Sequence, residues 1–166
     1  MPFKAGAACV KRWNCVILHY YQKAGHVNNR NVKNRSSNGF VAYQTSCQPT
    51  VSLVLDTIRS AMEKEKVAGE LHLHSDQGFQ YTSQAYFNLT KEYGIIPSMS
   101  RRGNPYDNAM AENFISILKT ECIYRQKIQT FAQAQELIDD YIIFYNFERF
   151  QMKYRLTPLE KRCQPA

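Results

Sequence analysis

The N-terminal third of the chain has no acidic side chains. No aspartate or glutamate precedes Asp56, although seven lysines and arginines lie in that stretch. The whole chain carries 21 basic and 14 acidic side chains, so its net charge of +7 arises entirely from this stretch. A basic segment of this kind attracts polyanions such as DNA, or it reflects a skewed composition without a function. Composition alone leaves both interpretations open.

Long apolar runs and cysteine pairs are also missing. No stretch approaches the roughly 20 apolar residues that a membrane-spanning helix needs, which argues against an integral membrane protein. The five cysteines are odd in number and include no Cys-x-x-Cys pair, which argues against a disulfide framework and against a structural zinc site. We therefore expect a protein of the reducing cytoplasm with no membrane partner.

The pattern of the chain changes near residues 36–39. Residues 1–38 form an atypical basic segment in which only 13–21 could make a strand, whereas 39–166 is regular. Strands are predicted over 40–45, 70–75 and 95–99, and helices over 49–66, 83–93 and 106–120. A further helix follows a capping box at 130–133, and a short final turn starts at 157. This order predicts an α/β fold with parallel crossover connections.

Asp76 stands directly after the predicted strand 70–75 and before a glycine turn. Alternate side chains of a strand share a face, so His72, His74 and Asp76 should lie together, opposite the leucines between them. One interpretation makes Asp76 a metal ligand at the carboxyl edge of the sheet, where α/β proteins gather their sites. The His-x-His pair also suggests zinc, but no third ligand follows at a suitable spacing. The histidines are otherwise ordinary sheet residues.

Two further groups of polar residues lie downstream. The first is a stripe along one side of the predicted helix 106–120. It consists of Asn108, Glu112, Ser116 and Lys119. Such a stripe is usually a solvated face, although a carboxylate within it is also a candidate for catalysis. The second is the pair Arg101 and Arg102 in a loop rich in glycine and proline, which could contact phosphates.

Three blocks of sequence occur together and change these interpretations. They are His-Ser-Asp-Gln-Gly-Phe-Gln-Tyr-Thr-Ser at 74–83, Ser-Arg-Arg-Gly-Asn-Pro-Tyr-Asp-Asn-Ala-Met-Ala-Glu-Asn-Phe at 100–114, and Tyr145-Asn146-x-x-Arg149 followed by Thr157-Pro158. Asp76 and Glu112 are separated by 35 residues. The combination closely resembles the integrase core of bacterial insertion-sequence transposases of the second-reading-frame type, which are related to retroviral integrases. The resemblance covers about residues 39–166.

The resemblance implies an RNase H-like fold, a mixed sheet flanked by helices, and a triad of two aspartates and one glutamate that binds two Mg²⁺ or Mn²⁺ ions. By this resemblance Asp76 is the second acid and Glu112 the third. Lys119 matches a basic position expected near DNA, and Asn108, Arg101 and Arg102 border the site. The implied partners are DNA, at element ends and targets, a second copy or an intact transposase, and a separate helix-turn-helix chain. The implied location is the bacterial cytoplasm, in association with the nucleoid.

The family's first aspartate has no counterpart in this sequence. The family places it on the first, central strand, whereas residues 13–19 contain no acid and offer only Asn14 as an isostere. A neutral amide cannot replace a carboxylate that bridges two cations. We therefore expect the first strands to be replaced or missing, the metal to bind weakly and catalysis to be impaired. The alternative is a non-catalytic DNA- or transposase-binding fragment that acts as an inhibitor.

Overall fold

The computed structural model describes residues 14–19, 21–22, 39–64, 71–101 and 109–163, and only the backbone of 14–19, 21–22 and 109–111. Its strands are β1 (Asn14–His19), β2 (Tyr21–Gln22), β3 (Phe40–Ser46), β4 (Leu71–Ser75) and β5 (Ile95–Met99). Its helices are α2 (Val51–Lys64), α3 (Gln84–Glu92), α4 (Ala109–Glu121), α5 (Phe131–Phe147) and α6 (Pro158–Cys163), with a short 3₁₀ turn η1 (Ile123–Arg125). The predicted order of elements is confirmed from β3 onward.

The strands form a mixed arrangement. β4 and β5 pair in parallel through α3, which confirms the predicted crossover, whereas β1 and β3 pair antiparallel. An antiparallel pair needs no crossover helix, so the alternation of elements could not reveal this pairing. β2 adds a short antiparallel pairing to β4, and β1 also contacts β4. β5 is the edge strand of the described order β2-β4-β5. It contains Pro97, whose missing N–H is tolerated in an edge strand.

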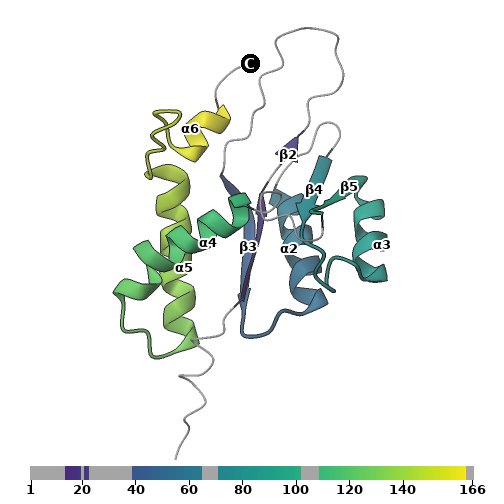
Figure 1. Ribbon diagram of the computed structural model, residues 1–166, viewed down its shortest axis with the longest axis horizontal. Coiled ribbons are helices and arrows are strands. Elements are labelled where there is room, and N and C mark those ends of the chain that lie inside the picture. The colour runs from purple at the N-terminus through teal and green to yellow at the C-terminus, as the bar shows by residue number, and fades with distance from the viewer. Residues whose placement is uncertain (1–13, 20, 23–38, 65–70, 102–108, 164–166) are drawn as a thin grey trace, which may run out of the picture.

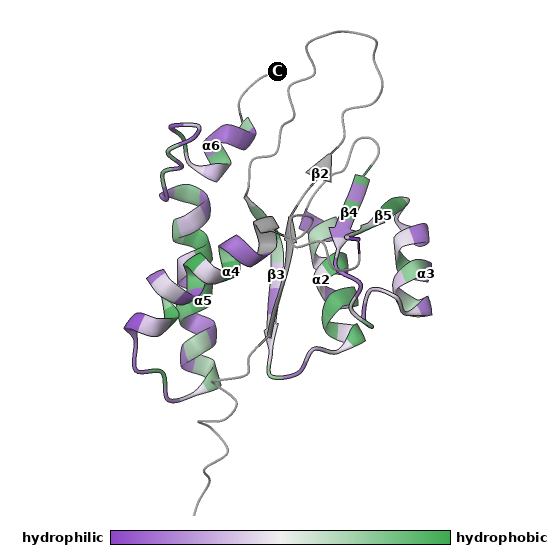
Figure 2. Cartoon of the chain, in the orientation of Figure 1, coloured by the Kyte–Doolittle hydropathy of each residue, from purple (hydrophilic) through white to green (hydrophobic). Residues whose placement is uncertain are grey.

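Two hydrophobic clusters lie on opposite sides of the β1–β3 pair (Figure 1). The first cluster joins α2, β4, α3 and β5. Its buried members are Val54, Ile58, Leu71, Leu73, Tyr86, Leu89 and Ile95. The second cluster joins β3, α4, η1 and α5. Its buried members are Phe40, Phe114, Leu118, Cys122, Ile123, Ile138, Tyr141, Ile142 and Tyr145. Figure 2 shows the matching apolar sides of α2 and α5.

Local sequence signals set the helix ends. Ser83 accepts a hydrogen bond from the Tyr86 backbone N–H and caps α3, and Gly94 follows that helix with a φ of 65°. At α5 the Thr130 hydroxyl accepts from the Gln133 N–H while the Gln133 side chain accepts from the Thr130 N–H, so the predicted capping box is confirmed.

The cysteines depart from the sequence expectation at one position. Cys47 is disulfide-bonded, whereas Cys122 and Cys163 carry free thiols. The odd number of cysteines therefore did not exclude a disulfide. Burial of the Cys122 side chain raises the pKa of its thiol, so it behaves as a small apolar residue of the second cluster. Within the described residues, no helix is long and apolar enough to cross a membrane.

Candidate functional site

Asp76 is the first residue after the carboxyl end of β4, the strand that pairs with β5. Leu71, Leu73 and Ser75 are buried while His74 and Asp76 are exposed, as the alternation of the strand predicts. The Ser75 carbonyl accepts hydrogen bonds from the Ser100 N–H at 2.9 Å and from the Ser100 hydroxyl at 3.3 Å. These bonds extend the β4–β5 pairing by one residue. The backbone immediately before Asp76 is therefore fixed.

A tight turn orients the Asp76 carboxylate. Its Oδ1 accepts a hydrogen bond from the Gly78 N–H at 2.8 Å. A Cβ at Gly78 would lie 2.9 Å from Asp76 Oδ1 and 2.9 Å from Gln80 Oε1, which is closer than carbon and oxygen normally approach. The Gln80 side chain in turn donates to the Pro49 carbonyl at 2.9 Å. Because residue 78 is a glycine, no Cβ occupies the space next to the Asp76 carboxylate.

Two tyrosines lie behind this turn. Burial raises the pKa of Tyr81 to about 12, and the negative charge of Asp76 adds to the rise. The Tyr81 ring meets the Tyr86 ring edge-on at 5.6 Å between centroids. Tyr86 is fully buried, and burial raises the pKa of its hydroxyl as well. Both phenols stay neutral at physiological pH, and Tyr81 lies near enough to the exposed Asp76 for that charge to act on it.

Glu112 lies in the first turn of α4 and is exposed. Among the described residues its side chain has no hydrogen-bond or ion-pair partner. Phe114, two positions later, points into the second cluster, with its ring 3.9 Å from that of Phe40 and 5.0 Å from that of Tyr145 between centroids. Glu112 therefore lies on the exposed side of α4, where the polar stripe in the sequence places it.

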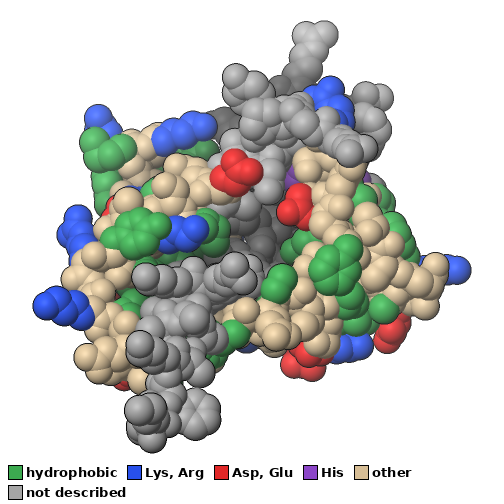
Figure 3. All heavy atoms as spheres, turned by 60° about the horizontal axis from the view of Figure 1, so that its bottom comes forward, with side chains coloured by type: hydrophobic (Ala, Val, Ile, Leu, Met, Phe, Trp, Pro, Cys, Tyr) green, Lys and Arg blue, Asp and Glu red, His purple; other side chains and the backbone are tan. Residues whose placement is uncertain are grey.

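The two carboxylates come from different halves of the molecule. The strand before Asp76 packs in the first hydrophobic cluster, and the helix that carries Glu112 packs in the second. The β1–β3 pair lies between the two clusters. Figure 3 shows acidic side chains near the middle of one face, on both halves. The relative position of the two acids therefore depends on how each half packs against β3.

The donor chemistry fits a hard divalent cation, because both side chains offer carboxylate oxygens. The described residues contain no group of three or more His, Cys, Asp or Glu side chains that could hold a metal. His74 Nδ1 lies 3.0 Å from the Ser98 hydroxyl, within hydrogen-bond distance, so its ring is engaged along the sheet. The zinc alternative thus gains no support from the described residues.

The predicted basic residues are described only in part. Arg101 is exposed and lies two residues after the end of β5, and Lys119 is half-buried in the last turn of α4. Lys119 follows Glu112 by seven positions, with exposed Ser116 between them, so these three share one side of the helix. Arg102 and Asn108 lie outside the described residues. Of the predicted set, Lys119 therefore lies on the same polar side of α4 as Glu112, whereas Arg101 lies after β5.

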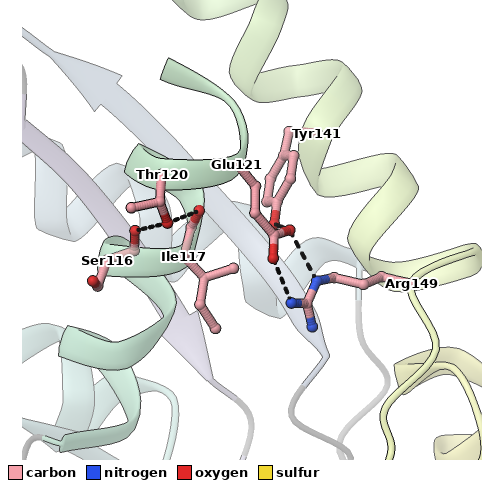
Figure 4. A network of polar contacts seen from close by, with 6 residues as sticks. All are labelled: Ser116, Ile117, Thr120, Glu121, Tyr141 and Arg149. Atoms are coloured by element: carbon pink, nitrogen blue, oxygen red, sulfur yellow. Dashed lines mark hydrogen bonds and ion pairs between the residues drawn. The ribbon is translucent and has the colours of Figure 1, made fainter. Parts of the chain in front are cut away.

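Sequence reasoning missed a polar network at the far end of α4. Arg149 donates to both carboxylate oxygens of Glu121, at 3.1 and 2.7 Å, and the Tyr141 hydroxyl donates to Glu121 at 2.6 Å (Figure 4). Hydrogen bonds from Arg149, and then from Tyr141, lower the pKa of Glu121 against the opposing effect of its burial. The signal for this network was the Tyr145-Asn146-x-x-Arg149 motif, to which no role was assigned.

Comparisons with known proteins point to one family. Two family models, both described as integrase core domain, match residues 12–105 and 93–155, so the first match begins inside the basic segment. The chain is 38% identical over 129 residues to the putative transposase InsK of insertion sequence element IS150 from Escherichia coli, with 77% of this chain and 46% of that protein covered. It is 35% identical over 155 residues to an uncharacterized transposase-like protein of Haemophilus influenzae, with 93% and 71% covered.

The chain thus spans less than half the length of the InsK relative and about seven-tenths of the Haemophilus relative. Among solved structures it is similar to the catalytic core of BIV integrase, with a TM-score of 0.57 and 25% identity over 76% of this chain and 79% of that one. It is also similar to the HTLV-2 integrase catalytic core in complex with magnesium, with a TM-score of 0.57 and 15% identity over 90% and 94%. These structures confirm the RNase H-like fold. With its integrase-core match and its transposase relatives, the chain belongs to the integrase core family of DDE transposases and integrases.

Proposed function

We propose that this chain is part of the catalytic core of an insertion-sequence transposase, and that Asp76 and Glu112 hold a divalent cation, Mg²⁺ or Mn²⁺, against DNA. The observation that carries the proposal is the orientation of the two acids. Each is exposed, and each is fixed from behind by a separate hydrophobic cluster. Exposed carboxylates on rigid supports are what a metal site for a large substrate requires.

A pair of divalent cations, when bound, activates the attacking oxygen and stabilises the leaving oxygen of phosphodiester transfer. The side chains of this chain contribute to only part of that arrangement. The turn at Gly78 holds Oδ1 of Asp76, and the packing of Phe114 turns Glu112 outward. With no acid before Asp56, a ligand that would bridge a second cation is missing. We therefore expect one weakly bound cation and impaired strand transfer.

Basic side chains supply the contacts to DNA in this proposal. Arg101 follows β5 on the Asp76 half, and Lys119 lies on the same side of α4 as Glu112. Contacts of this kind go to phosphates, so they position DNA without reading its sequence. Recognition of element ends is then left to a separate helix-turn-helix chain, and a second copy or an intact transposase is the expected protein partner.

The missing acid favours a second candidate function. A chain that binds DNA or an intact transposase but cannot complete the metal site would act as an inhibitor of transposition. This candidate predicts that added chain reduces strand transfer by an intact transposase from the same element. Under the leading proposal any such reduction should depend on Asp76 and Glu112, whereas the inhibitor candidate does not require either acid.

Two measurements test the leading proposal. Binding of Mn²⁺, followed through the loss of the free-ion electron paramagnetic resonance signal, should weaken in both Asp76→Asn and Glu112→Gln. DNA cleavage and joining assays on element-end DNA should show no product with Mg²⁺ or Mn²⁺ for the chain as it stands. Replacing residues 1–38 by a family first strand with its aspartate should restore activity that Asp76→Asn then abolishes. Robust strand transfer by the unaltered chain would refute impairment, and Asn14 and His74 would then be the first groups to test as the third ligand.

A further inference from the structure

The Tyr145-Asn146-x-x-Arg149 motif lies at the C-terminal end of α5 and has no part in the chemistry proposed above. Its asparagine bonds to the backbone at the start of β3, at a residue that also pairs with β1. Phe40 N–H donates to Asn146 Oδ1 at 2.9 Å, and Asn146 Nδ2 donates back to the Phe40 carbonyl at 3.1 Å. One amide therefore satisfies both backbone groups of a residue 106 positions away, and it fixes where β3 begins relative to α5.

The residue held by Asn146 supports the N-terminal part of α4. The Phe40 ring lies 3.9 Å from the Phe114 ring and 4.9 Å from the Tyr145 ring between centroids. Phe114 is almost fully buried and follows Glu112 by only two positions. A shift of Phe40 therefore moves the surface against which the first turns of α4 pack. These tilted ring contacts connect the residue that Asn146 holds to the helix that carries Glu112.

The arginine of the motif holds the other end of the same helix. Arg149 donates to both oxygens of Glu121, the last residue of α4, and its guanidinium lies 5.5 Å from the centre of the Tyr145 ring. Tyr141 donates a further bond to Glu121, so that carboxylate is held by one residue of α5 and by Arg149, which lies two residues after the end of α5 (Figure 4). A two-bonded arginine–carboxylate pair fixes orientation as well as distance.

We infer that Asn146 and Arg149, the α5 clamp, are positioning residues that hold α4 at both ends and thereby fix Glu112 relative to Asp76. A helix held at one point can pivot, whereas a helix held at two points cannot. Metal ligands must be held within about 0.5 Å of their productive positions, so a small pivot of α4 would cost affinity. This role rests on the proposed function of Glu112 as a metal ligand.

The test measures the affinity of the full chain for Mn²⁺ alone. Asn146→Asp keeps the size of the side chain but removes its donor, and Arg149→Met removes the ion pair. We expect each variant to bind Mn²⁺ about tenfold more weakly while its circular dichroism spectrum stays that of the wild type. The matched controls are Asn88→Asp, which alters an exposed contact on α3, and Arg59→Met, which removes an exposed ion pair on α2. Both controls should bind Mn²⁺ as the wild type does.

A second background separates positioning from general loosening of the fold. In Glu112→Gln the affinity that remains belongs to Asp76, so adding Asn146→Asp or Arg149→Met should lower it no further. An equal loss in both backgrounds would overturn the inference, because the clamp would then act on the whole molecule. Unchanged Mn²⁺ affinity in the two clamp variants would also overturn it while leaving the proposed function intact. If Glu112→Gln itself keeps wild-type affinity, the proposed function fails first.

The gentler change Tyr141→Phe keeps the test decisive if both clamp variants fail to fold. It removes one of the hydrogen bonds to Glu121 and leaves the ring in the core. We expect a smaller but measurable loss of Mn²⁺ affinity, which should again vanish in the Glu112→Gln background. Wild-type affinity in a folded Tyr141→Phe variant would count against the clamp.

Discussion

Substituting Gly78 by alanine should damage the candidate metal site and leave the fold nearly intact. The added Cβ would lie 2.9 Å from Asp76 Oδ1 and 2.9 Å from Gln80 Oε1. Both atoms are at the ends of flexible side chains, so they can move by a few tenths of an ångström without moving the backbone. The Asp76 carboxylate then leaves the position set by its bond to the Gly78 N–H.

The magnitudes separate the two effects. Shifts of a few tenths of an ångström lie at the low end of the off-rotamer cost, about 0.5 kcal/mol for each of the two side chains, and a part of this is offset because alanine restricts the unfolded chain by about 0.4–1 kcal/mol. The free energy of unfolding should therefore change by about 1 kcal/mol or less. Displacing a metal ligand is more serious, and changes in the residues that orient ligands typically weaken metal binding about 10–100-fold.

Gly94→Ala provides the opposite pattern as a control. Nothing lies within 4 Å of a Cβ at Gly94, but its φ of +65° is a left-handed conformation that costs alanine roughly 1–2 kcal/mol. Gly94→Ala should thus lower the midpoint of urea unfolding and leave Mn²⁺ affinity unchanged. Gly78→Ala should weaken Mn²⁺ binding and leave the midpoint of urea unfolding nearly unchanged. If Gly78→Ala unfolds more easily than Gly94→Ala and still binds Mn²⁺ normally, the geometry assigned to the turn is wrong.

Two further predictions concern charge. The Arg149 hydrogen bond lowers the pKa of Glu121 below its ordinary 4.5, so the pair stabilises the fold above that pH, and this stabilisation is lost as the pH falls through the lowered value. The difference in unfolding midpoint between the wild type and Arg149→Met should therefore shrink on acidification below 4.5. A difference that stays constant would contradict this prediction. Binding of DNA should weaken steeply with salt and show little sequence preference. The double variant Arg101→Ala with Arg102→Ala should reduce affinity for all DNA sequences alike. Binding that survives high salt with an unchanged sequence preference would exclude a phosphate-based interface.

Local features of this fold could be predicted from the sequence because their causes are local. The capping box of Thr130 and Gln133 needs only four consecutive residues, and it begins α5 where expected. The alternation of β4 placed Leu71 and Leu73 in the core and left Asp76 outside, because side chains of a strand alternate whatever the partner. Most of the geometry around Asp76 is of this short-range kind.

Contacts between distant segments could not be predicted in the same way. The antiparallel pairing of β1 with β3 and the bonds from Asn146 to Phe40 depend on tertiary packing, which periodicity does not encode. The same limit applies to the site, since Asp76 follows a strand that packs in one hydrophobic cluster and Glu112 lies on a helix that packs in the other. The motif around Asn146 and Arg149 was visible in the sequence, but its role needed the structure.

The bond between Asn146 and Phe40 also bears on the order in which the protein is made. Synthesis proceeds from the N-terminus, so Phe40 and Glu112 leave the ribosome before the residues that fasten them. Until Asn146 arrives, the Phe40 backbone groups must bond to water, and joining the two segments carries the loop-closure cost of 106 intervening steps. A nascent chain therefore acquires both candidate metal ligands before it acquires the packing that sets their separation.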